Sequence, residues 1–138
     1  MNTNIPPVYP SPHADAMSGP YWEGTRRGAL VVQRCGACGS LRHYPQVLCA
    51  RCYSDLIDWV ELSGRGAVHS WTICYHAFHP AFVQDVPYAL VTVDMEEGVR
   101  AMGRLDGLQF ENLSVGLALR ATFPRRADGF GQLTFEPR

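Results

Sequence analysis

Four of the five cysteines of this 138-residue chain form two CxxC pairs, Cys35 with Cys38 and Cys49 with Cys52. In a chain without secretory features, paired cysteines indicate metal or redox chemistry before they indicate disulfides. Two facing CxxC turns place four thiolates around one centre, which is the tetrahedral sulfur cage that zinc prefers. The spacing therefore predicts one zinc ion, whereas two disulfides, an iron centre with four thiolate ligands and a redox-active CxxC remain alternatives.

The predicted cage leaves no coordination position for a substrate, so we expect a structural zinc ion rather than a catalytic one. Gly36 and Gly39 suit the first CxxC turn, because a chain that bends tightly around a metal needs residues without a bulky side chain. Metal binding can supply about 10 kcal/mol toward the folding of a segment that is too small for a core of its own.

The remaining sequence predicts one short helix and otherwise β-structure. Residues 1–17 are rich in proline and serine and predict an extended arm. Ser18 and Pro20 are typical of a helix start, so a helix is expected over residues 20–27. Apolar or alternating runs predict strands at 29–34, 41–44, 59–63, 67–78, 88–95, 100–105, 117–124 and 132–135. Five or six short strands after the cysteines, without a long helix, favour a small closed barrel.

Charge and hydropathy exclude some classes of function. The chain has 12 basic and 13 acidic residues, and every basic residue is arginine. Proteins that bind nucleic acid through its phosphates usually carry a clear basic excess, so the charge argues against that partner. No apolar run approaches the roughly 20 residues that cross a bilayer, and residues 1–18 lack the pattern of a secretory signal. We therefore expect a cytoplasmic protein with no membrane partner.

Several motifs follow one another in order along residues 18–137. They are Tyr21-Trp22 on the short helix, the two CxxC pairs, Tyr44-Pro45, Trp59, Ser63-Gly64-Arg65-Gly66 and Pro87-Tyr88. Together they resemble the family that joins a rubredoxin-like zinc ribbon to an acyl-CoA-associated OB-fold barrel. The resemblance implies a mainly β fold in three parts: an N-terminal arm and short helix (1–28), a zinc ribbon (29–57) and a five- to six-stranded OB-fold barrel (58–138).

The resemblance also implies a function. Members of this family are accessory subunits of thiolase-like enzymes, retro-aldolases and MaoC-like hydratases that act on coenzyme A thioesters, including steroid side chains. By this resemblance the chain is expected to bind such a catalytic chain and to help form its acyl-CoA site, without catalysis of its own. The residues predicted to contact the catalytic chain are Tyr21, Trp22, His76, Phe78, His79 and Phe82.

Three arginines are candidates for direct contact with acyl-CoA. Arg120, Arg125 and Arg126 could bind a phosphate of coenzyme A, because the guanidinium fork matches phosphate oxygens in a bidentate manner. The alternative for these residues is a solvated strand end.

Two other functions compete with the accessory-subunit interpretation. OB-fold barrels and zinc ribbons both occur in proteins that bind single-stranded nucleic acid, and the arginines near the cysteines keep this alternative open. A free-standing enzyme would need a catalytic residue that the sequence does not supply. His69, His76 and His79 lie near one another in sequence, but only Asp85 could join them in a metal site, so we interpret them as interface residues.

Overall fold

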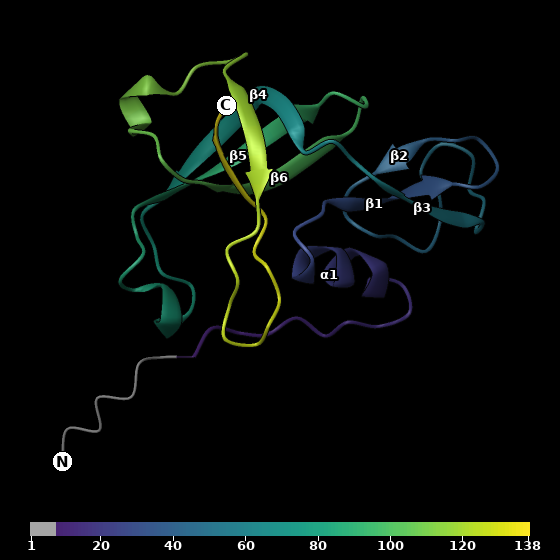
Figure 1. Cartoon of the computed structure of the whole chain (residues 1–138), viewed down its shortest axis with the longest axis horizontal. Helices are drawn as coiled ribbons and strands as arrows, with labels where there is room; N and C mark the ends of the chain where they lie inside the picture. The colour runs from purple at the N-terminus through teal and green to yellow at the C-terminus, as the bar shows by residue number, and fades with distance from the viewer. Residues whose placement is uncertain (1–7) are drawn as a thin grey trace.

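The computed structural model describes residues 8–138 and confirms a mainly β architecture (Figure 1). Of the predicted arm, residues 1–7 lie outside this described part. The elements in chain order are α1 (Gly19–Arg26), β1 (Val31–Cys35), β2 (Leu41–Arg42), β3 (Ile57–Glu61), β4 (Arg65–Cys74), η1 (Pro80–Phe82), β5 (Tyr88–Met95), β6 (Arg100–Leu105), η2 (Phe110–Asn112), β7 (Ala118–Thr122) and β8 (Thr134–Pro137).

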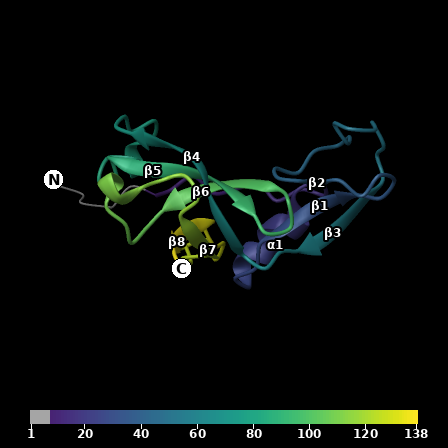
Figure 2. The same ribbon diagram turned by 90° about the horizontal axis from the view of Figure 1, so that it is seen from above.

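A three-stranded sheet in the order β2-β1-β3 forms the cysteine-bearing end of the molecule. The predicted strand at 59–63 lies here: β3 begins at Ile57 and pairs with β1 along its whole length, from Cys35 opposite Ile57 to Val31 opposite Glu61. We expected this strand in the barrel, but it supplies the third strand that the small sheet needs. Figure 2 shows this sheet and the barrel at opposite ends of an elongated molecule, with α1 between them.

The other five strands close into a barrel in the order β4-β5-β6-β8-β7, with β7 pairing back to β4. All pairs are antiparallel except β6 with β8, which are parallel. Buried and partly exposed residues alternate along β5, so Val91 and Val93 point inward, whereas Leu90 and Thr92 face outward. A bulge between Val68 and Ser70 interrupts the pairing of the long strand β4 with β5. Bulges of this kind bend a strand, as closure of a small barrel requires.

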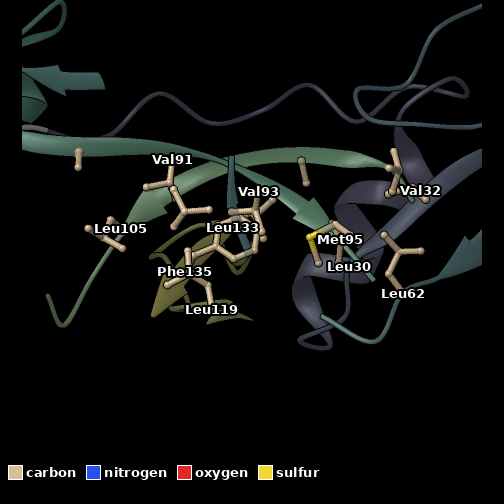
Figure 3. Packing of buried hydrophobic residues seen from close by; sticks show 14 of the residues in the cluster. Leu30, Val32, Leu62, Val91, Val93, Met95, Leu105, Leu119, Leu133 and Phe135 are labelled. Carbon is tan, nitrogen blue, oxygen red and sulfur yellow. The ribbon is translucent and has the colours of Figure 1, made fainter. Parts of the chain in front are cut away.

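One hydrophobic core runs from the barrel to the small sheet (Figure 3). Phe135 and Leu119 lie fully buried inside the barrel. At the other end of the same cluster, Met95 meets Leu30 and Val32, which flank the start of β1. The small sheet is therefore anchored on the barrel by apolar packing, and the two parts share one core.

Helix α1 fills the angle between the small sheet and the barrel. It begins one residue earlier than the sequence predicts, after Ser18, whose backbone N–H and hydroxyl both donate to the Asp15 carboxylate. Its last turn lies against the β7–β8 loop, where Gly131 approaches so closely that an added Cβ would lie 2.4 Å from the Thr25 carbonyl oxygen. Only glycine fits this contact. Within residues 8–138, no helix is both long and apolar enough to span a membrane.

Candidate metal centre and partner surface

Two matching turns hold the four cysteines. In the first, Cys35 ends β1, its carbonyl accepts from the Gly39 N–H at 2.9 Å, and its own N–H donates to the Ser40 carbonyl. In the second, the Cys49 carbonyl accepts from the Tyr53 N–H at 2.9 Å and its N–H donates to Ser54. Gly39 and Tyr53 occupy the equivalent left-handed position, with φ of +77° and +63°. The two CxxC segments thus have the same local fold, as facing knuckles around one metal require.

The four sulfur atoms come together at a single point. All four Sγ atoms lie within 4.8 Å of one another, with Cys35 to Cys52 at 3.5 Å and Cys38 to Cys49 at 3.7 Å. Zinc–sulfur bonds of about 2.3 Å in a tetrahedron require sulfur separations of about 3.8 Å, whereas a disulfide requires about 2.05 Å. The donor set and its spacing therefore fit zinc and do not fit disulfides.

Electrostatics in the cluster favour a bound cation. The N–H groups of Cys38 and Ala37 point at the Cys35 sulfur and lower its thiol pKa, and hydrogen bonds from Ser40 lower the pKa of Cys38 to about 6. The Ser54 backbone lowers the pKa of Cys52, but hydrogen bonding to Cys35, burial, and hydrogen bonding to the other two sulfurs together outweigh it and raise the pKa to about 11. Cys35 and Cys38 therefore lose their protons readily, whereas Cys52 resists deprotonation because negative sulfur atoms surround it. A divalent cation at the centre would stabilise the fully deprotonated cluster.

A buried glutamine fixes the loop between the two cysteine turns, and sequence reasoning missed it. Gln33 is fully buried in β1, and its side-chain oxygen accepts from the Arg42 Nε at 2.5 Å and from the Gln46 N–H at 2.8 Å. The signal for this role was a polar residue inside an apolar β-branched run. Because a buried amide needs partners, such a residue indicates a loop that folds back onto the strand.

The structure separates the histidines by role. His69 in β4 lies 3.3 Å from the Asp94 carboxylate, His79 accepts from the Ala81 N–H as the cap of η1, and His76 packs edge-on against Phe78. None of these three belongs to the cluster of potential metal ligands found in the described chain, which consists of the four cysteines.

The predicted partner residues divide into buried and exposed ones. Tyr21 is only 5% exposed and belongs to the core, so it cannot lie on a free surface as we expected. Trp22 packs on Phe130, and Phe82 packs on Tyr9 of the arm. Phe78, by contrast, is 84% exposed in the β4–β5 loop.

Exposed apolar side chains also gather around the cysteine turns, although none of them was among the residues predicted to contact the catalytic chain. They are Tyr44, Val47, Leu48, Tyr53 and Leu56. The apolar residues in this part of the sequence were the signal, because a small metal-centred sheet has too few core positions to bury them all. Exposed apolar groups in such density are typical of a protein-binding surface.

The three arginines predicted to bind coenzyme A have separate partners. Arg120 on β7 donates to the Glu136 carboxylate at 2.7 Å. Arg125 donates to the Arg26 carbonyl and Arg126 to the Pro10 carbonyl, both from the loop between β7 and β8. Arg125 and Arg126 thus share one loop, whereas Arg120 is engaged in an ion pair on the barrel wall.

Comparison with protein-family models gives two adjoining matches. Residues 22–58 match the rubredoxin-like zinc ribbon domain of ChsH2, and residues 59–124 match the C-terminal OB-fold domain of ChsH2. The boundary between these matches falls inside β3. The part that carries the four cysteines is therefore the zinc-ribbon match, in agreement with the sulfur geometry.

Individual relatives agree with these matches. The chain is 35% identical over 108 residues to a probable enoyl-CoA hydratase alpha subunit of Thermomonospora curvata, and 36% identical over 103 residues to the 3-oxo-4,17-pregnadiene-20-carboxyl-CoA hydratase alpha subunit of Mycobacterium tuberculosis. These stretches are 78% and 75% of this chain but only 33% and 32% of the relatives, so the chain spans about a third of their length. Among solved structures, a chain of the Ltp2-ChsH2(DUF35) aldolase superposes with a TM-score of 0.79 at 31% identity, covering 92% of this chain and 98% of that one.

Proposed function

Since the chain belongs to the ChsH2 family, which joins a rubredoxin-like zinc ribbon to an OB-fold domain, we propose that it is an accessory subunit of an enzyme that acts on acyl-CoA thioesters. The observation that carries this proposal is the similarity to the aldolase chain, because it extends over nearly the whole of both chains. The catalytic partner we propose is an aldolase, hydratase or thiolase-like chain, with steroid or other lipid side chains as the substrate class.

The zinc ion has a structural role in this proposal. Cys35, Cys38, Cys49 and Cys52 would hold it, and with four sulfur ligands it would fold the ribbon rather than activate a substrate. The folded ribbon then presents its exposed apolar residues in a fixed arrangement. Two of them, Tyr53 at 77% and Leu56 at 58% exposure, lie beside the second cysteine turn.

A second exposed element supports docking to a protein. Phe78 packs edge-on against His76, in a loop that also exposes Tyr75 and Val83. Aromatic residues that are ordered but exposed are the usual anchors of protein interfaces. We propose that the ribbon surface and this loop are the contacts with the catalytic chain, with Trp22, His79 and Phe82 at their margin.

We also propose that the chain itself contacts acyl-CoA, through arginines that bind a phosphate of coenzyme A. Arg125 and Arg126 lie side by side in the β7–β8 loop, so one phosphate group could reach both of them. Arg120 lies apart from them on β7, in an ion pair with Glu136. Isothermal titration of coenzyme A into the assembled complex, with Arg125→Ala and Arg120→Ala compared, tests it. We expect a larger loss of affinity for Arg125→Ala, and equal affinities would contradict a phosphate contact in this loop.

Co-purification from the native cell tests the proposed function. The untagged chain should elute with a hydratase, aldolase or thiolase chain that is identified by mass spectrometry, and the complex should turn over an acyl-CoA. Phe78→Ser should weaken this association, whereas Val115→Ser, at another highly exposed position (73%) in the β6–β7 loop, serves as the matched control. An isolated chain, or one that carries nucleic acid, would refute the proposal.

A further inference from the structure

The N-terminal arm runs along the ends of the β4–β5 and β7–β8 loops, on one side of the barrel. From Val8 it runs without regular secondary structure to the helix start, and Figure 1 shows it stretched from the β4–β5 loop, past the β7–β8 loop, to α1. Pro10 and Pro12 favour an extended backbone in this segment. The arm therefore has the shape of an extended peptide ligand.

Contacts with the β4–β5 loop fix one end of the arm. The Tyr9 hydroxyl donates to the Asp85 carboxylate at 2.7 Å, and the Tyr9 ring packs on Phe82 with centroids 5.1 Å apart. Arg104 of β6 donates to the same Asp85 carboxylate at 3.2 Å. The Tyr9 side chain is thus held at both ends: its hydroxyl by Asp85 and its ring by Phe82.

Contacts with the β7–β8 loop fix the next residues. Arg126 donates to the Pro10 carbonyl at 2.8 Å and places its guanidinium 5.2 Å from the Tyr9 ring centroid. The Ser11 hydroxyl donates to the Asp128 carboxylate at 2.8 Å. Three consecutive arm residues therefore each contact a loop that lies more than a hundred positions away in the sequence.

A cavity of about 270 Å³ lies next to the residues that contact the Tyr9 ring. Its lining includes Phe82 and Arg126, which hold the Tyr9 ring, together with Leu90 and Met102 on the outer face of β5 and β6. The cavity thus lies over the outer surface of these two strands, with the two loops that hold the arm at its edge. Trp22 and Tyr44 also line it, whereas no residue of 8–13 does.

This cavity coincides with the place where OB-fold barrels bind ligands. Such barrels take extended ligands on the face of their second and third strands, between the loop that joins strands one and two and the loop that joins strands four and five. Here those strands are β5 and β6, and those loops are β4–β5 and β7–β8. We propose that residues 8–13 bridge these two loops at the mouth of the OB-fold ligand groove in cis, as a displaceable peptide that closes this face to single-stranded nucleic acid.

A peptide-binding experiment tests the proposal. The chain without residues 1–14 retains Asp15, which accepts hydrogen bonds at the helix start, and its folding is verified by zinc content and circular dichroism. A fluorescent peptide with the sequence of residues 7–14 should bind this shortened chain saturably, and bind the full chain at least ten-fold more weakly. A Tyr9→Ala peptide should lose about ten-fold in affinity, because it lacks the hydroxyl and the ring. A Val8→Ser peptide is the control, since Val8 is 77% exposed.

Three outcomes would overturn the proposal. The first is that the peptide does not bind saturably to the folded shortened chain, and the second is that it binds both chains equally. The third is that the shortened chain binds an oligothymidylate tightly and the peptide does not compete with it. If the shortened chain does not fold, cleavage between Val8 and Tyr9 by elastase in the full chain gives an independent answer. Asp85→Asn should then accelerate cleavage about five-fold, through loss of a charge-assisted hydrogen bond, whereas an unchanged rate would show that the β4–β5 loop does not hold the arm.

Discussion

His43 should make the stability of the folded chain depend on pH between about 4 and 6.5. Burial among the ribbon residues lowers the pKa of this imidazole from 6.5 to about 4. Its ring lies against Tyr21 and Tyr44, and its Nε2 atom has no hydrogen-bond partner in the described part of the chain. Because the folded pKa is the lower one, the unfolded chain binds the proton more readily, and stability falls as pH falls through this window.

The size of this effect follows from the shift. One pKa unit corresponds to about 1.4 kcal/mol, so the full shift is worth about 3 kcal/mol below pH 4, of which about 2 kcal/mol is already lost at pH 5. Urea unfolding at pH 7 and pH 5, with saturating zinc, measures the loss in the native chain and in His43→Phe. We expect the native chain to lose about 2 kcal/mol more than the variant between these two pH values.

The comparison of the native chain with His43→Phe also removes the effect of acid on zinc binding. Protonation of the cysteines weakens zinc binding equally in both proteins, so it cancels in the difference between them. His13→Phe is the matched control, because the exposed His13 side chain is hydrated in the folded and the unfolded chain alike. Parallel pH dependence in the native chain and His43→Phe would refute the argument from burial.

Further predictions concern the core, a close backbone contact and the metal. Phe135→Ala should lower the free energy of unfolding by about 3–5 kcal/mol in urea titrations, because the ring is fully buried in the barrel. Gly131→Ala should lower it by about 2 kcal/mol or more, since the added methyl group would lie 2.4 Å from a carbonyl oxygen of α1, whereas Gly19→Ala, with open space around it, should be near neutral. We expect elemental analysis to find about one zinc ion per native chain. Cys35→Ser should lose this zinc and abolish partner binding while much of the barrel still folds, whereas Cys74→Ser should keep it.

Local patterns in the sequence predicted the parts of the fold that depend on neighbouring residues. The strands over 88–95 and 100–105 have the predicted ends, because alternation of apolar side chains is a property of each strand alone. The cysteine cluster followed from spacing for the same reason, since each CxxC turn is a local structure. The helix is displaced by one residue, within the usual uncertainty of helix ends.

Features that depend on distant residues were not predictable in this way. The β-branched pattern of residues 57–61 indicates a strand but not its partner, and β1 proved to be that partner. Tyr21 was expected at the partner surface from the family resemblance, yet its side chain is buried in the core. The contact of Tyr9 with Asp85 joins residues 76 positions apart, and no periodicity marks the arm as a bound segment.

The continuity of the core has a consequence for how the chain would bind a larger partner. The Leu62 N–H donates to the Leu30 carbonyl at 2.9 Å just beyond the end of β3, and both side chains belong to the same cluster as Met95 of the barrel. The ribbon is therefore not a module on a flexible tether, and its exposed residues keep a fixed distance and direction from Phe78. A catalytic chain that touches both surfaces must match this rigid spacing, so small losses of packing at Leu30 would disturb docking without removing any residue of the interface.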